Sequence, residues 1–381
     1  MKHIGVYLSS DQHGGGTYQY NLSIISALRK LDRNEYKLTA FIHCESWNKH
    51  LSDNFTAILT KKTLVRKVLK KIYRISKLSR RFPFFFNPMV YEMNNSDCDI
   101  IIFPSQDEES YQSSKKSLSA IHDLMHRYES HFQEYQNGEY DLRERHYSLM
   151  SKNSNGILVD SVVGKQHVVD SYNINEEKVF VLPFVPPFYL LESISVDVKG
   201  KYGLPSKYFF YPAQFWEHKN HINLLLALKL LKDRNVVCDL VLVGSKKNNY
   251  NNVVNKINEL GLSENVHILG YVSNDDMAAL YISALATTFV SLIGPTNIPP
   301  LEAMVIGSPL ICSNVYAMPE QVGDAALLVD PRNPLDIAAK MELLAVDYEL
   351  AIDLVQKGKE KMQEYSQKEF SELLESYIKC L

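Results

Sequence analysis

Apolar and polar positions alternate along this chain in blocks that predict strands and helices in turn. Short apolar runs are followed by stretches whose apolar residues recur every three or four positions, as on one face of a helix. The strands expected in the first half span residues 3–8, 37–42, 99–103, 119–121, 156–159 and 178–182. Those expected in the second half span residues 208–211, 239–244, 266–269, 286–290, 309–312 and 326–329. Such alternation predicts an α/β protein whose parallel sheets are covered by helices on both faces.

A proline-rich stretch at residues 182–187 interrupts this alternation, and little pattern follows as far as Gly203. A chain of 381 residues is also too long for one ordinary core. We therefore expect two doubly wound domains, residues 1–190 and 200–381, with the amphipathic last helix packing back toward the first domain. If the two domains face each other, a cleft at the carboxyl ends of both sheets would bind the ligand.

The composition is that of a globular protein, with 45% hydrophobic and 22% charged residues, and this excludes a disordered or fibrous chain. The five cysteines are scattered and lack the spacing of metal ligands, so we expect no disulfide framework, no metal site and a reducing compartment. The first apolar run is too short for a signal peptide. No stretch approaches the ~20 apolar residues of a membrane-spanning helix, so we expect a cytoplasmic protein.

Charge is distributed unevenly along the chain. The formal net charge is −3, yet residues 61–81, here called the basic segment, hold ten basic side chains and no acidic one. Without these ten, 31 basic residues stand against 44 acidic ones. The apolar residues of the basic segment follow helical spacing, so it either docks on an anionic membrane surface or forms a solvated helix on its own domain. We favour docking, and expect no nucleic-acid role because the remaining surface is acidic.

Two strand ends in the first half carry candidate site residues. Gly15 and Gly16 lie between the first strand and a helix, where free N–H groups can bind an anion; a tight turn is the alternative. His122 follows the strand expected at 119–121. It can donate to a sugar hydroxyl or take a proton near neutral pH, or it is simply hydrogen-bonded into a loop.

Two further candidates lie in the second half. Lys219, near the start of a helix expected at 222–231, suits a phosphate, although most lysines are ordinary surface residues. The most specific element is the Gly/Pro-rich loop and helix of residues 294–304. Glu302, expected in the first turn of that helix, either holds a ribose diol or interacts only with the helix dipole.

Taken together, these segments resemble the retaining glycosyltransferases of family 4, over nearly the whole chain and most strongly in residues 208–331. The motifs that carry the resemblance are Gly15-Gly16, Ile121-His122-Asp123-Leu124, His218-Lys219-Asn220-His221, Gly270-Tyr271-Val272, Pro299-Pro300-Leu301-Glu302-Ala303-Met304 and Gly307-Ser308-Pro309. The resemblance implies the GT-B fold of two facing Rossmann-like domains. It also implies transfer of a sugar from a GDP- or UDP-sugar to an acceptor hydroxyl, with retained configuration and no metal or other cofactor.

The resemblance gives each motif a role. His122 would touch the transferred sugar or the acceptor hydroxyl, Lys219 would neutralise the departing diphosphate, and Glu302 would hold the donor ribose. The remaining donor contacts would come from Gly15, Gly16, Gln214, Val272, Asn297, Ile298 and Leu301. Val272 would meet the base through its backbone, and the others would border the phosphates.

The chain departs from the family pattern at two positions. The family has a second glutamate eight residues before Glu302, where this chain has Gly294; Thr296 or Asn297 is the candidate replacement. Gln214 stands where an arginine often joins the lysine on the diphosphate. Gln214 can donate a hydrogen bond but carries no charge, so Lys219 would bear more of the anion.

The leading hypothesis is a glycosyltransferase at the inner face of the cytoplasmic membrane. It would extend a saccharide acceptor, lipid-linked in our hypothesis, in the biosynthesis of a bacterial surface polysaccharide or lipopolysaccharide. One alternative is a nucleotide-sugar epimerase, because fold alone does not fix chemistry. Another is an inactive scaffold, which Gly294 and Gln214 suggest.

Overall fold

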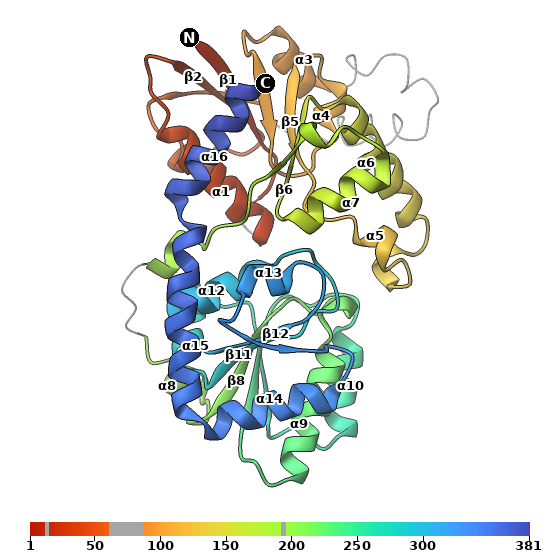
Figure 1. The fold of residues 1–381 in the computed structure, drawn as a ribbon, viewed down its shortest axis with the longest axis vertical. Helices are drawn as coiled ribbons and strands as arrows, with labels where there is room; N and C mark the ends of the chain where they lie inside the picture. Colours follow the sequence, from red (N-terminus) through yellow and green to blue (C-terminus); the bar gives the residue numbers. More distant parts are fainter. Residues whose placement is uncertain (12–14, 61–86, 192–195) are drawn as a thin grey trace. The chain divides into compact units, whose positions relative to one another are not determined.

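The structure is a computed structural model that describes residues 1–11, 15–60, 87–191 and 196–381 (Figure 1). The basic segment lies outside the described residues, so its docking on a membrane stays a prediction. The described chain forms two compact units. The first unit consists of Met1–Leu124, Asp141–Pro183 and Gln367–Leu381, and the second of Met125–Tyr140 and Phe184–Ser366.

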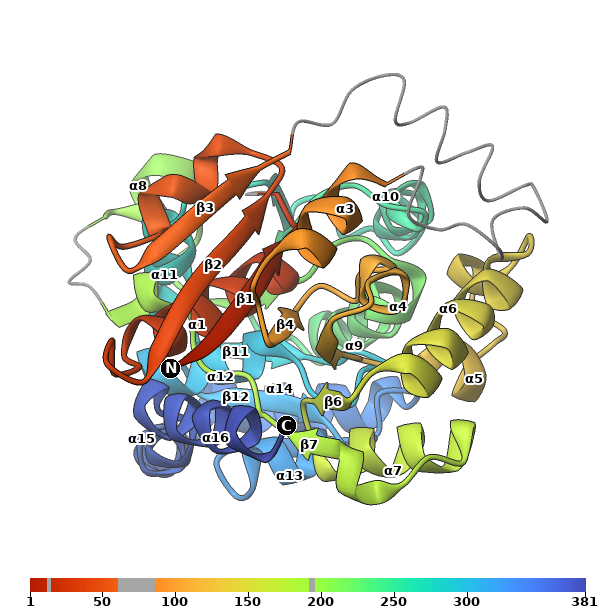
Figure 2. The ribbon, with the colours of Figure 1, turned by 90° about the horizontal axis from the view of Figure 1, so that it is seen from above.

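In its described part, the first unit is built on a parallel sheet of seven strands in the order β3-β2-β1-β4-β5-β6-β7. Figure 2 shows β1, β2 and β3 running side by side. Strands β4 and β6 are apolar along their whole length, as is typical of parallel strands buried on both faces. The strands are β1 Lys2–Leu8, β2 Tyr36–Ile42, β3 Phe55–Leu59, β4 Ile100–Phe103, β5 Lys116–Ala120, β6 Gly156–Val159 and β7 Val179–Val181.

The helices of the first unit include the last one in the chain. Helix α16 packs against α1, and Figure 1 shows the two side by side. Tyr377 of α16 donates a hydrogen bond to the carbonyl of Val181, 2.7 Å away, so the chain's final helix is part of this unit's core. The described helices are α1 Gly16–Arg29, α3 Pro88–Asn95, α4 Glu109–Gln112, α6 Glu139–Asn153, α7 Val162–Tyr172 and α16 Gln367–Cys380.

The described part of the second unit contains a parallel sheet of six strands in the order β10-β9-β8-β11-β12-β13. Its strands are β8 Tyr208–Pro212, β9 Asp239–Val243, β10 Val266–Gly270, β11 Ala286–Phe289, β12 Leu310–Ser313 and β13 Leu327–Val329. The main helices around it are α9 His221–Asp233, α10 Tyr250–Glu259, α11 Asn274–Ser283, α12 Ile298–Ile306, α14 Pro334–Val346 and α15 Tyr348–Lys361. Three short helices, α5 Met125–Tyr128, α8 Val198–Tyr202 and α13 Met318–Val322, also belong to it.

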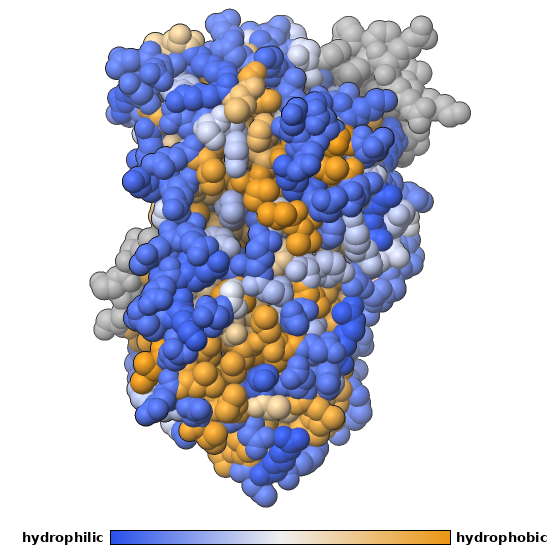
Figure 3. Space-filling view, in the orientation of Figure 1, coloured by the Kyte–Doolittle hydropathy of each residue, from blue (hydrophilic) through white to orange (hydrophobic). Residues whose placement is uncertain are grey.

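No helix among the described residues is both long and apolar enough to cross a bilayer. Figure 3 shows apolar residues at the surface of the second unit around α14. Its large exposed apolar side chains on α14 and α15 are Leu335, Leu343, Val346, Tyr348 and Ile352. None of them belongs to a motif singled out in the sequence.

The structure differs from the sequence prediction in one strand and in the composition of the units. Strand β3, a short edge strand whose residues are only partly buried or exposed, was not predicted. The segment Met125–Tyr140 belongs to the second unit, although the sequence placed it inside the first domain. The last helix was counted in the domain spanning residues 200–381 but was expected to pack back toward the first domain, and it belongs to the first unit.

Because of His221, the first residue of α9, we expect the folded protein to lose stability at acid pH. Its ring is fully buried and stacks on Phe215 at a centroid distance of 4.6 Å. Burial lowers the pKa of His221 to about 3, whereas in the unfolded chain it is about 6.5. Between these two pKa values, His221 is protonated in the unfolded state but neutral in the folded state. Stability is complete above about pH 6.5 and falls toward pH 3, by up to about 1.4 kcal/mol per pH unit.

The measurement is urea unfolding at a series of pH values for the wild type and His221→Phe. Phenylalanine cannot be protonated. The free energy of unfolding of the His221→Phe variant should therefore fall less steeply than that of the wild type between about pH 6 and pH 4. Equal slopes for the two proteins would show that His221 is not responsible for the acid sensitivity.

Candidate active site

The turn that carries Lys219 joins β8 to α9 at the carboxyl edge of the second unit's sheet. It is a short 3₁₀ helix, Glu217–Lys219, which Asn220 ends in the left-handed conformation with φ 61°. The Asn220 amide donates to the carbonyls of Val290 and Pro331 at 2.9 and 2.6 Å. These two bonds tie the turn to the loops that follow β11 and β13.

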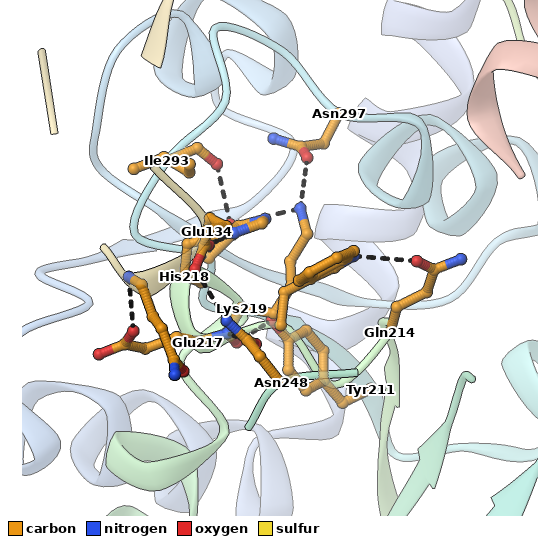
Figure 4. Close-up of polar contacts among 12 residues, drawn as sticks. Glu134, Tyr211, Gln214, Glu217, His218, Lys219, Asn248, Ile293 and Asn297 are labelled. Atoms are coloured by element: carbon orange, nitrogen blue, oxygen red, sulfur yellow. Dashed lines mark hydrogen bonds and ion pairs between the residues drawn. The ribbon is translucent and has the colours of Figure 1, made fainter. Parts of the chain in front are cut away.

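The ammonium group of Lys219 is held by neutral oxygens (Figure 4). It donates to Asn297 Oδ1 at 3.0 Å and to Ser291 Oγ at 3.4 Å. It also lies 5.1 Å from the centre of the Phe289 ring, a distance at which a cation is attracted to an aromatic face. An ammonium group placed at the carboxyl edge of a parallel sheet suits a site for an anionic ligand.

Asn297 opens helix α12 and is fixed through its backbone. Its N–H donates to Gln321 Oε1 at 3.1 Å, and Gln321 Nε2 donates back to its carbonyl at 2.7 Å. Gly294, in the same loop, has φ 115°, and a Cβ built there would lie 2.6 Å from Asn297 Nδ2. The Asn297 side chain therefore occupies the space beside Gly294 and meets Lys219 from there.

Glu302 lies deeper than the sequence suggested. Helix α12 begins at Ile298, so Glu302 falls after the first turn, and the prediction that placed it in the first turn was wrong. Pro299 and Pro300 lie inside its first turn, where proline is tolerated because the N–H groups there have no helical partner. The dipole explanation for Glu302 loses its basis with this shift.

The Glu302 carboxylate is buried and accepts hydrogen bonds from two phenols. Tyr189 donates to Oε1 at 2.9 Å and Tyr281 donates to Oε2 at 2.6 Å. Burial raises the pKa of Glu302, although both phenols oppose that shift by stabilising the charged form. Neither tyrosine was predicted from the sequence, since each lies on a different element and shares no spacing with Glu302.

Four other predicted donor contacts also lie in the second unit. Gln214 follows β8 and accepts a hydrogen bond from Trp216 Nε1 at 3.0 Å, so its amide is oriented by its neighbour. Val272 is buried just after β10, behind the exposed Tyr271. Ile298 is the first residue of α12, and the Leu301 side chain is fully buried in the core. Of the predicted residues in this unit, Lys219 and Asn297 contact each other directly.

The first unit holds the remaining predicted residues. Gly15, with φ 59°, precedes Gly16 at the start of α1, after β1. His122 follows β5 and is hydrogen-bonded in its loop: Nε2 lies 2.9 Å from the carbonyl of Pro104. Burial lowers the pKa of His122, so the ring is neutral at neutral pH. With Nε2–H donating to that carbonyl, Nδ1 is an acceptor, which suits a hydroxyl donor.

Sequence reasoning missed Glu134, which lies in the segment Met125–Tyr140 of the second unit. Its Oε1 is paired with Nδ1 of His218, and its Oε2 accepts from Asn248 Nδ2 at 3.1 Å. Burial alone would raise the pKa of Glu134, but the hydrogen bonds from His218 and Asn248 lower it overall. No local pattern could have indicated this pair, because 84 positions separate the two residues.

The two doubly wound parallel sheets define the GT-B fold class, as the sequence predicted. HepE of Anabaena, solved in complex with UDP and glucose, is similar over 100% of both chains, with a TM-score of 0.76 and 15% sequence identity. Residues 198–361 match the model of the family described as "Glycosyl transferases group 1". This range contains Lys219, Asn297 and Glu302.

Two curated relatives match shorter stretches. The O-antigen chain mannosyltransferase B of Escherichia coli is 33% identical over 133 residues, which cover 35% of this chain and 35% of the relative. The O-antigen chain mannosyltransferase RfbU of Salmonella typhimurium is 26% identical over 175 residues, covering 46% of each chain. The matches therefore span less than half of these relatives' own length.

Proposed function

We propose that the protein is a retaining glycosyltransferase that moves a mannosyl group from a nucleoside diphosphate sugar to a saccharide hydroxyl, in the synthesis of an O-antigen or similar surface polysaccharide. The observation that carries this proposal is the Lys219 ammonium, held by neutral oxygens at the carboxyl edge of a group 1 glycosyl transferase domain. The choice of mannose rests on the names of the two curated relatives.

In the proposed reaction, the bond from the sugar's anomeric carbon to the diphosphate breaks while a bond to the acceptor oxygen forms on the same face. The acceptor proton passes to the departing phosphate oxygen, so no protein base is required. Negative charge grows on the diphosphate as it leaves, and Lys219 stabilises that charge more in the transition state than in the ground state. The positive end of the α12 helix dipole adds to this stabilisation.

The other predicted residues bind and orient. Glu302 holds the ribose, using lone pairs that its two phenol partners do not occupy, and Val272 meets the base through its backbone. Gln214 donates an amide hydrogen to the diphosphate. From the first unit, the backbone of Gly15 and Gly16 approaches the diphosphate. His122, as a neutral acceptor at Nδ1, receives a hydrogen bond from a hydroxyl of the transferred sugar or of the acceptor.

The test is a donor panel: GDP- and UDP-sugars are incubated with the purified protein, first in water and then with a lipid-linked acceptor extract. We expect GDP- or UDP-mannose to be consumed, with release of the nucleoside diphosphate. An epimerase would instead yield a new nucleotide sugar without any acceptor. A scaffold would bind nucleotide and consume no donor in either condition, and that result would overturn the proposal.

We also propose that the acceptor is lipid-linked and that the protein works at the inner face of the cytoplasmic membrane. This part rests on the basic segment. Flotation with anionic vesicles provides the second arm of the test. Replacing Lys67, Lys70, Lys71 and Arg74 by glutamate should abolish flotation, because each nearby cation contributes about 1 kcal/mol of attraction. Unchanged flotation would refute docking through this segment and leave the donor result unaffected.

A further inference from the structure

The segment Met125–Tyr140, here called the strap, runs along the carboxyl edge of the second unit's sheet. It contacts the loops that follow β9, β8, β11, β12 and β13, which are neighbours in that order. The residues it contacts in these loops are, in the same order, Asn248, His218, Ile293, Tyr316 and Arg332. A segment with this course can fix several loops of the edge at once.

Two carboxylates of the strap make side-chain contacts at different places along the edge, and the N–H of Gln133 donates to Glu217 Oε2 at 3.1 Å. Glu129 Oε1 accepts from the Tyr316 hydroxyl at 2.7 Å and from Arg332 Nη2 at 2.9 Å, on the loops after β12 and β13. Glu134 binds His218 and Asn248, on the loops after β8 and β9. Glu134 is thus the acid of the strap that meets the turn bearing Lys219.

His218 is held on several sides. Its ring pairs with Glu134 and meets the edge of the Phe132 ring at a centroid distance of 6.2 Å. The side chains of His218 and Glu134 are only 16% and 8% exposed, so solvent screens the pair little. The carbonyl of His218 accepts the N–H of Leu292 at 2.8 Å. Since Lys219 is the next residue, fixing the ring and the peptide of His218 fixes the backbone from which Lys219 reaches Asn297.

We infer that Glu134 is a positioning residue, which acts through His218 to hold Lys219 in place before the donor binds. The inference rests on the proposed role of Lys219 in the reaction. The position of Lys219 matters for the rate of the reaction, because a displacement of about 1 Å caused by a change outside the reacting centre can lower the rate about 10²-fold. Glu134 itself needs no contact with either substrate.

The test compares Glu134→Gln with Glu129→Gln, a matched loss of one strap carboxylate. Glutamine offers one acceptor oxygen, so at position 134 either His218 or Asn248 loses its partner. We expect Glu134→Gln to lower kcat with mannosyl donor by about tenfold or more and to leave the donor KM within about threefold of wild type. Glu129→Gln should keep a kcat near that of the wild type. Equal kcat values for the two variants would overturn the inference.

A double variant distinguishes positioning from general damage. If Glu134 acts through Lys219, then Glu134→Gln combined with Lys219→Ala should be no slower than Lys219→Ala alone. If the loss of kcat in the double variant equals the product of the losses in the two single variants, Glu134 acts by another route, and the inference is contradicted.

Hydrogen–deuterium exchange gives a readout that needs no turnover. In the absence of donor, peptides covering residues 214–224 should exchange faster in Glu134→Gln than in Glu129→Gln or the wild type. Unchanged exchange there would refute the inference even if the donor panel succeeds. If no donor is consumed by the wild type, the proposed function fails, and the exchange comparison still decides whether Glu134 orders the turn.

Discussion

Lys219→Ala should lower kcat by about 10²–10³-fold, the range found when one preorganised donor to a developing anion is removed. Lys219 is the cation that the structure places against Asn297 and Ser291, and the arginine that often assists in the family is Gln214 here. With no second charge from that position, the diphosphate depends more on Lys219. Affinity for the nucleoside diphosphate should fall as well, because the charge contacts the product too.

The measurement is steady-state transfer or hydrolysis with the active donor, together with calorimetry of the nucleoside diphosphate. Lys229→Ala is the matched control: it removes a lysine of the same unit whose partner is Asp233, one helical turn along α9. A surface pair of this kind contributes little, so this variant should retain wild-type kcat. A Lys219→Ala variant with normal turnover would exclude the assigned role.

Gly294→Ala should cost both stability and turnover. Alanine at φ 115° is strained, by about 1–3 kcal/mol, and its Cβ would lie 2.6 Å from Asn297 Nδ2. Asn297 must therefore move away from the position in which it holds Lys219. We expect turnover to fall by at least about tenfold, as misplaced catalytic groups do. Restoring the glutamate of the family pattern at this position should be worse, because a larger side chain meets the same contact.

Two further variants separate strain from crowding. Gly203 also has a positive φ, 63°, with nothing within 4 Å of a built Cβ, so Gly203→Ala should lose stability alone. Combining Gly294→Ala with Asn297→Gly removes the crowding, and urea unfolding should show partial recovery. Turnover should stay low, because Lys219 then lacks its amide partner. Recovery of full turnover in the double variant would show that Asn297 does not position Lys219.

Much of the fold was predictable because buried parallel strands have continuous apolar sequences. Strand β4, for example, is fully buried and apolar throughout. Strand β3 was missed because it is a short edge strand whose apolar residues are partly exposed rather than buried. Glu302 was misplaced in the first turn of α12 because the helix begins earlier than expected, at Ile298, with Pro299 and Pro300 in its first turn.

The candidate site was predictable only where its residues sit in contiguous motifs. Lys219 and Asn297 each belong to a local pattern, and their hydrogen bond unites two such patterns. Tyr189, Tyr281 and Glu134 belong to none, since they meet their partners only after folding brings distant elements together. A contact between two residues far apart in the chain produces no repeating pattern in the sequence. The neighbours of Glu302 and His218 could therefore be identified only from the structure.

The chain passes between its two units at residues 124–125, 140–141, 183–184 and 366–367. An exchange of donor specificity by grafting residues 200–381 from another enzyme would therefore transfer a helix that belongs to the recipient's half. It would also leave behind the strap on which the grafted loops rest. Chimeras that respect the architecture must carry residues 125–140 with the second unit and retain residues 367–381 with the first. For recombination, the exchangeable module of this protein is discontinuous in sequence.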